Sequence, residues 1–119
     1  MHIAYLEDNA ANVALVQRII GMTPHTLTIY SDGEEACPHI LNREFDLIFM
    51  DIELAGKLSG VELVRRIREA GLQVPVIALT AYAMVGDRER CLAAGCTDYL
   101  AKPFGVGDFL EMIDKYSTS

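Results

Sequence analysis

Short apolar runs alternate with amphipathic stretches five times along this chain, and this alternation limits the folds open to it more than any other feature. We expect strands over residues 3–6, 26–30, 45–50, 74–79 and 97–100. Each run is followed by a stretch in which apolar residues recur at helical spacing, as Val106, Phe109, Leu110 and Ile113 do. Strand–helix units in this order predict an α/β fold, with a doubly wound parallel sheet covered by helices on both faces.

Length and charge exclude several classes of protein. The 119 residues suffice for one domain with a real core, since 51% of them are hydrophobic. The formal net charge of −7 argues against direct nucleic-acid binding and against an anionic membrane surface. The longest nearly apolar run, 74–85, is shorter than the roughly 20 residues that a bilayer requires. We therefore expect no membrane association, and a cytoplasmic protein.

The three cysteines and one proline add to this picture. Cys37, Cys91 and Cys96 have no CxxC spacing, and the N-terminus has no signal peptide, so free thiols are expected. Pro38 lies within a helix predicted over 34–41, where it removes a backbone hydrogen bond. We expect that helix to be kinked or to start later than its capping residues suggest.

Candidate site residues follow four of the five predicted strands. Glu7 and Asp8 follow the first strand, Asp51 the third, Thr80 the fourth and Lys102 the fifth. Open parallel sheets bind ligands at the carboxyl ends of their strands. We therefore expect three carboxylates, a hydroxyl and an ammonium group to meet at one edge of the sheet.

This set of groups has a specific chemistry. Three neighbouring carboxylates repel one another, and a hard divalent cation such as Mg²⁺ relieves that repulsion. A carboxylate can also act as a nucleophile and form an aspartyl phosphate. Phosphoryl transfer then needs charge neutralisation and positioning, which Mg²⁺, Lys102 and Thr80 are suited to provide.

Five segments in this order resemble the receiver domain of two-component response regulators, over essentially the whole chain. The matching segments are residues 6–9, 31–36, 45–52, 78–81 and 94–104. The resemblance implies a flavodoxin-like fold with strand order 2-1-3-4-5. It also implies that Asp51 is the phosphoacceptor. Mg²⁺, with Mn²⁺ as a substitute, would be bound directly by Asp8, Asp51 and the backbone carbonyl of Glu53, and by Glu7 through water.

The same resemblance assigns a switch. Thr80 and Lys102 would contact the phosphoryl group, and Tyr99 would change rotamer as Thr80 moves. Lys102 and Pro103 would be joined by a cis peptide bond. Ala83, Met84 and Val85 would form a partner surface together with Tyr99. Glu53 and Tyr82 would border the path of the water that hydrolyses the phosphoryl group.

The resemblance implies a single receiver domain over residues 1–119 without an output domain, either a stand-alone regulator or a receiver domain isolated from a longer protein. Its phosphoryl donor would be a sensor histidine kinase or a histidine phosphotransfer protein, and its target another protein. We expect a monomer, with dimerisation on phosphorylation as an alternative. It would not be a conventional enzyme, although it would support Mg²⁺-dependent phosphoryl uptake and slow autodephosphorylation.

Other readings stay open at this point. Taken singly, Glu7 and Asp8 are a common charge pair at a helix N-terminus, Thr80 a helix cap, Lys102 a surface lysine and Tyr99 a packed aromatic. A pseudo-receiver would bind partners without phosphorylation. An aspartate-nucleophile phosphatase would carry a D-x-D motif after its first strand, and a flavin protein a Ser/Thr/Gly-rich loop there. Here Asp51 follows the third strand and no aspartate stands two residues after it, which argues against the phosphatase. The segment Asn9-Ala10-Ala11-Asn12 is a poor phosphate loop, which argues against the flavin protein.

Overall fold

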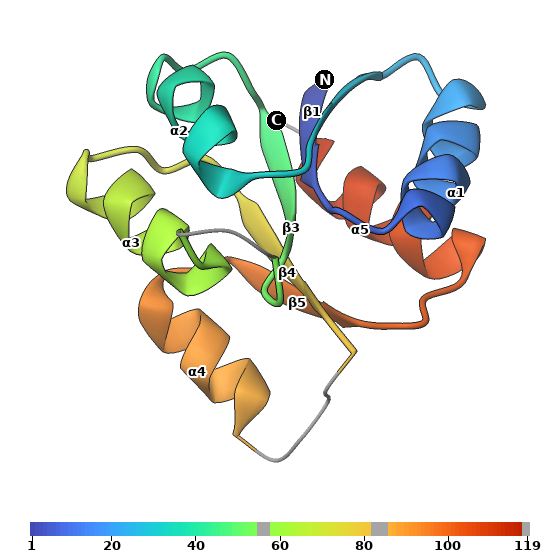
Figure 1. Cartoon of the computed structure of the whole chain (residues 1–119). Helices are drawn as coiled ribbons and strands as arrows, with labels where there is room; N and C mark the ends of the chain where they lie inside the picture. The colour runs from blue at the N-terminus through green and yellow to red at the C-terminus, as the bar shows by residue number, and fades with distance from the viewer. Residues whose placement is uncertain (55–57, 82–85, 118–119) are drawn as a thin grey trace.

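Five strands and five helices alternate along the part of the chain that the computed structural model describes, residues 1–54, 58–81 and 86–117 (Figure 1). The strands are β1 (His2–Leu6), β2 (Thr26–Tyr30), β3 (Leu47–Asp51), β4 (Val76–Thr80) and β5 (Asp98–Ala101). The helices are α1 (Ala10–Gly21), α2 (Gly33–Leu41), α3 (Gly60–Glu69), α4 (Asp87–Ala94) and α5 (Val106–Ser117).

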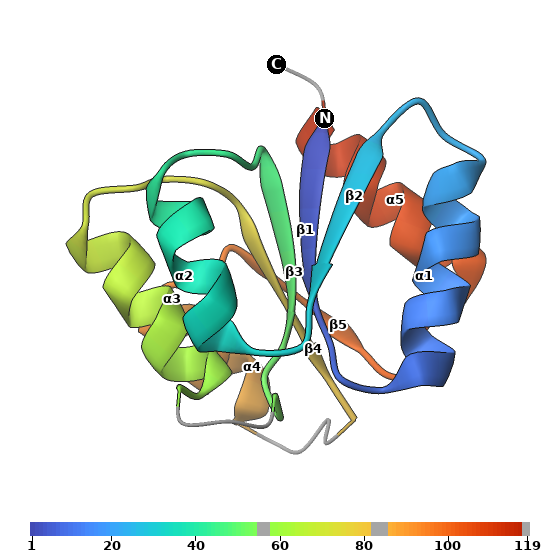
Figure 2. The same cartoon turned by 45° about the horizontal axis from the view of Figure 1, so that its top comes forward.

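All the strand pairs are parallel, and the strand order is β2-β1-β3-β4-β5. Helices α1 and α5 cover one face of the sheet, and α2, α3 and α4 cover the other, as the two views agree (Figures 1 and 2). The predicted doubly wound parallel sheet and the implied strand order are confirmed. Within the described residues, no helix has the length and apolar character needed to cross a membrane.

Short capping side chains begin three of the helices. The side chains of Asn9, Asp32 and Ser59 accept backbone N–H groups at the starts of α1, α2 and α3. Helix α4 is followed by Gly95 as its C-terminal cap, and the φ of 116° at Gly95 lies in the left-handed region that favours glycine. These local signals mark the starts of α1, α2 and α3 and the end of α4.

Helix α2 begins directly after its cap and includes Pro38, so a later start for this helix is wrong. Proline removes the N–H that would donate to the carbonyl of Glu34. Both Glu34 and Pro38 are exposed, and water can satisfy that carbonyl. The proline is therefore tolerated on the outer side of a short helix.

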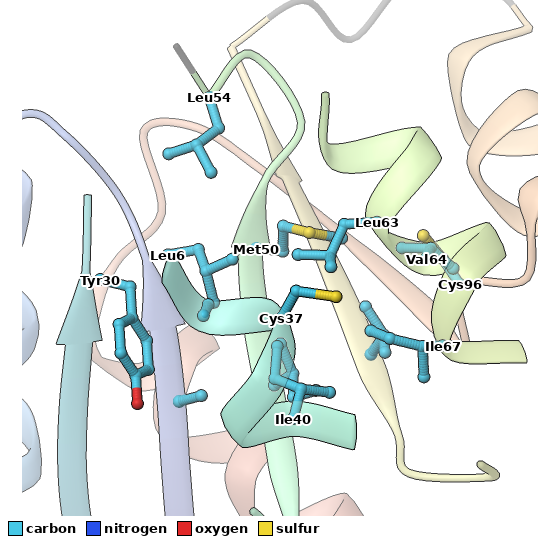
Figure 3. Packing of buried hydrophobic residues seen from close by; sticks show 14 of the residues in the cluster. Leu6, Tyr30, Cys37, Ile40, Met50, Leu54, Leu63, Val64, Ile67 and Cys96 are labelled. Carbon is cyan, nitrogen blue, oxygen red and sulfur yellow. The ribbon is translucent and has the colours of Figure 1, made fainter. Parts of the chain in front are cut away.

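The core consists of two clusters, one on each face of the sheet. Figure 3 shows the cluster beneath α2 and α3, in which Leu6 and Met50 meet Cys37, Ile40 and Leu63. The other cluster joins Ile3, Tyr5, Leu47, Phe49, Ile77 and Leu79 to α1 and α5. Side chains alternate between the two faces along each strand.

The three cysteines are thiols rather than disulfides, as expected, and all three are buried. Burial, which is the larger effect, and the neighbouring Cys91 raise the pKa of Cys96 to about 12, although Arg68 opposes this shift. These thiols are therefore part of the packing on the α2–α4 side of the sheet.

Candidate functional site

The carboxyl ends of β1, β3, β4 and β5 meet at one edge of the sheet because these strands are neighbours in register. Leu6 pairs with Met50, Asp51 with Leu79, and Thr80 with Ala101. A cleft of about 290 Å³ lies at this edge, lined by Glu7, Asp8, Asn9, Asn12, Asp51, Glu53, Ala81 and Lys102. The cleft has room for a hydrated ion and a phosphoryl group, since a water occupies about 30 Å³ in the liquid.

Three carboxylates converge in this cleft. Glu7, Asp8 and Asp51 each offer an oxygen, and these oxygens all lie within 4.8 Å of one another. Glu7 is 1% exposed and Asp51 5% exposed, whereas Asp8 is open to solvent. Hard oxygen ligands at this spacing suit a divalent cation, which would approach from the side of Asp8.

Lys102 lies between two of the carboxylates. Its Nζ is 2.7 Å from Glu7 Oε1 and 3.1 Å from Asp51 Oδ2. Burial by itself lowers the pKa of Lys102, but the hydrogen bonds and charges of Glu7 and Asp51 outweigh this effect and raise it. The acidic side chains of the cleft outnumber this one ammonium group, and such an acidic excess suits a dication.

Glu7 is held by more donors than the sequence indicated. Besides Lys102, its Oε1 accepts the Tyr5 hydroxyl at 3.0 Å and the Asn12 side-chain amide at 3.1 Å. Its Oε2 accepts the backbone N–H of Asn9 at 3.4 Å. Burial, followed by the charge and hydrogen bond of Glu7, raises the pKa of Tyr5.

Sequence reasoning missed Tyr5 and Asn12 as part of this site. A signal for Tyr5 was present, because residues two apart in a strand share a face, and Tyr5 precedes Glu7 by two. Asn12 lies on the first turn of α1, a few residues after Glu7. Because both residues are asparagines, nothing in the sequence indicated that Asn12, rather than the helix-capping Asn9, would contact Glu7 through its side chain.

Asp51 and Thr80 are linked through Glu53. The backbone N–H of Glu53 donates to Asp51 Oδ1 at 2.9 Å. The Thr80 hydroxyl donates to the Glu53 carboxylate at 2.6 Å. Glu53 was expected to offer its backbone carbonyl to the metal and to border the path of the hydrolytic water, so the hydrogen bond of its side chain with Thr80 is an addition to the predicted set.

Tyr99 lies apart from the cleft. It is partly buried and packs against the core cluster on the face that α2, α3 and α4 cover. The peptide bond between Lys102 and Pro103 is cis, as the resemblance implied. Tyr82 and the predicted partner-surface residues Ala83, Met84 and Val85 lie outside the described residues.

Comparison with known families agrees with this arrangement. The family model described as response regulator receiver domain matches residues 3–114. The chain therefore belongs to the receiver domain family of two-component signalling, whose members are signalling proteins rather than conventional enzymes.

Two kinds of curated relative match the chain. The polar-differentiation response regulator DivK of Brucella ovis is 37% identical over 113 residues, which cover 93% of this chain and 91% of DivK. Other matched relatives are longer, and the chain spans about half of their length at 33% identity. The receiver unit thus occurs among its relatives both nearly alone and within larger proteins.

Solved structures give the same result. The receiver domain of the sensor histidine kinase PA1611 of Pseudomonas aeruginosa is 38% identical with a TM-score of 0.85, covering 97% of this chain and 95% of that one. That structure holds a magnesium ion in its active-site cleft. The receiver domain of Ssk1 of Saccharomyces cerevisiae, crystallised with the histidine phosphotransfer protein Ypd1, is 27% identical with a TM-score of 0.88, covering 98% and 88%.

Proposed function

We propose that the chain is a phosphoacceptor of a two-component phosphorelay, in which Asp51 accepts a phosphoryl group from a phosphohistidine in the presence of Mg²⁺. The observation that carries this proposal is the meeting of three carboxylates and the Lys102 ammonium in one cleft. The magnesium ion in the PA1611 receiver domain supports the choice of metal. Mn²⁺, which also prefers oxygen ligands, would serve as a substitute.

The metal would be bound by Asp8, Asp51 and the backbone carbonyl of Glu53. Glu7 would act through water, because its Oε1 already accepts hydrogen bonds from Tyr5, Asn12 and Lys102. A bound Mg²⁺ would supply positive charge that offsets the negative charge of the phosphoryl oxygens.

The reaction itself requires one bond to form and one to break. A carboxylate oxygen of Asp51 forms a bond to phosphorus, and the phosphorus–nitrogen bond of the donor histidine breaks, leaving its electron pair on the imidazole. Lys102 and Thr80 then contact the phosphoryl oxygens. Slow hydrolysis of the acyl phosphate, which the chain itself would support, returns Asp51 to its free form.

Phosphorylation adds a charge of about −2 to the cleft. Thr80 and Lys102 respond to this charge, Tyr99 changes its packing, and a surface formed by α4, β5 and α5 changes with it. The donor would be a sensor histidine kinase or a phosphotransfer protein, a choice that the PA1611 and Ssk1–Ypd1 structures support. The output would be contact with another protein.

Beryllofluoride, which mimics a phosphoryl group on a carboxylate, tests this proposal. Fluorine NMR of the chain with beryllofluoride should give a bound signal only when Mg²⁺ is present. Asp51→Asn should abolish that signal. Asp114→Asn on α5 is the matched control, because it removes the same charge from an exposed aspartate outside the cleft, and it should bind normally.

Two results would contradict the proposal. Absence of a bound signal in the folded wild-type chain would favour a receiver-like module that acts without phosphorylation. Multiple turnovers of a phosphomonoester such as p-nitrophenyl phosphate would instead indicate a phosphatase.

A further inference from the structure

We infer that the Glu53 side chain is a positioning residue that holds Thr80 in its resting conformation. It does so by accepting the hydrogen bond that the Thr80 hydroxyl would otherwise donate to a phosphoryl oxygen on Asp51. This inference rests on the proposed function and goes beyond the metal-binding role expected for the Glu53 backbone. It identifies a contact that must break before the protein can switch.

The turn after β3 brings Glu53 to the end of β4. Ile52 donates its backbone N–H to Leu79 at 3.0 Å, and Leu54 donates to Asp51 at 3.3 Å. This turn holds the Glu53 carboxylate 2.6 Å from the Thr80 hydroxyl. Short bonds from a hydroxyl to an ionised carboxylate are among the stronger hydrogen bonds in proteins.

Thr80 is fully buried, whereas Glu53 is exposed. A buried hydroxyl needs an acceptor, and Glu53 supplies one in the absence of a phosphoryl group. Since a hydroxyl has one proton, donating it to a phosphoryl oxygen means withdrawing it from Glu53. The carboxylate and the phosphoryl group are therefore competing acceptors for the same proton.

Competition of this kind changes populations. Consider a ligand that requires molecules in which the Thr80 hydroxyl is released from Glu53. Its apparent dissociation constant is the intrinsic one divided by the fraction of molecules in that released form. Removing the Glu53 acceptor should raise that fraction and tighten the binding of a phosphoryl mimic. The exposed position of Glu53 allows its substitution with little loss of packing.

A double-mutant cycle isolates this effect from simple electrostatics. Beryllofluoride affinity is measured at saturating Mg²⁺ for wild type, Glu53→Ala, Thr80→Val and the double variant. Thr80→Val keeps the shape of the side chain and removes its hydroxyl. Loss of the Glu53 charge changes the affinity for an anionic ligand equally in the wild-type and Thr80→Val backgrounds. This electrostatic contribution therefore cancels in the cycle.

We expect Glu53→Ala to tighten beryllofluoride binding by about fivefold in the wild-type background, and by much less in the Thr80→Val background. Glu53→Gln, which keeps an acceptor oxygen without the charge, should lie between wild type and Glu53→Ala. Glu62→Ala, an exposed carboxylate on α3, is the matched control and should leave the affinity unchanged.

A second readout reports on the resting state. In Glu53→Ala without beryllofluoride, the NMR shift of the Thr80 amide should move toward its beryllofluoride-saturated value. Equal tightening in both backgrounds, or no tightening, would overturn the inference while leaving the proposed function intact. Failure of the wild-type chain to bind beryllofluoride would overturn the proposed function, and this inference with it.

Discussion

At the scale of single residues, Glu7 shows how the cleft maintains a buried charge. A carboxylate that is almost fully removed from water requires several hydrogen bonds to offset its lost hydration. Glu7 receives them from Tyr5, Asn9, Asn12 and Lys102. Three of these four donors come from β1 and the start of α1, so the strand and the following helix together prepare the site.

Tyr5→Phe tests this support. The change keeps the ring in the core and removes one donor from a buried carboxylate, so the free energy of unfolding should fall by about 1 kcal/mol. Urea unfolding followed by circular dichroism measures the difference. Tyr30→Phe is the matched control, because Tyr30 packs through its ring against His39 and Phe45. An equal loss in both variants would show that the Glu7 contact contributes nothing specific.

At the scale of elements, the apolar pattern located the strands and helices well, and their ends less well. The third, fourth and fifth strands each end one residue later than the apolar run predicted, at Asp51, Thr80 and Ala101. Polar residues at the end of a strand still pair through their backbones, which hydrophobicity does not report. Two of these residues, Asp51 and Thr80, are site residues, so the apolar pattern alone does not place them in the sheet.

The contact between β5 and α5 gives a pH-dependent prediction. Asp98 Oδ2 accepts Lys115 at 2.8 Å and Tyr116 at 2.7 Å. Burial raises the pKa of Asp98, but these two hydrogen bonds and that of the Tyr99 backbone outweigh it and lower the pKa below its usual value. Because the pKa of Asp98 is lower in the folded state, its ionised carboxylate stabilises the fold at pH values above the pKa of about 3.9 in the unfolded chain. This stabilisation is lost as the pH falls through the lower pKa of the folded state.

Asp98→Asn should therefore destabilise the chain by about 1 kcal/mol at pH 7. The difference from wild type should shrink as the pH is lowered below about 4, where the unfolded carboxyl becomes protonated. Urea unfolding of both chains at a series of pH values measures this. If the difference in unfolding free energy between the two chains stays constant down to the lowest pH at which both still fold, the charge of Asp98 does not stabilise the contact.

At the scale of the whole molecule, strand order turns distant residues into neighbours. Glu7 and Lys102 are 95 positions apart, and they meet because β1 and β5 end at the same edge of the sheet. The convergence of polar strand ends could be predicted from the rule for parallel sheets, and so could the candidate ligands. The partner of each side chain could not, because hydrogen bonds such as that between Thr80 and Glu53 depend on turn geometry that a residue pattern does not contain.

The most direct test of the account is the intact mass of the chain after incubation with Mg²⁺ and acetyl phosphate. We expect an added mass of one phosphoryl group on the wild-type chain, located by peptide mapping to Asp51. We expect no addition in Asp51→Asn or when Mg²⁺ is chelated. An unchanged mass for the folded wild-type chain, or the same addition in Asp51→Asn, would contradict the assignment of Asp51 as phosphoacceptor.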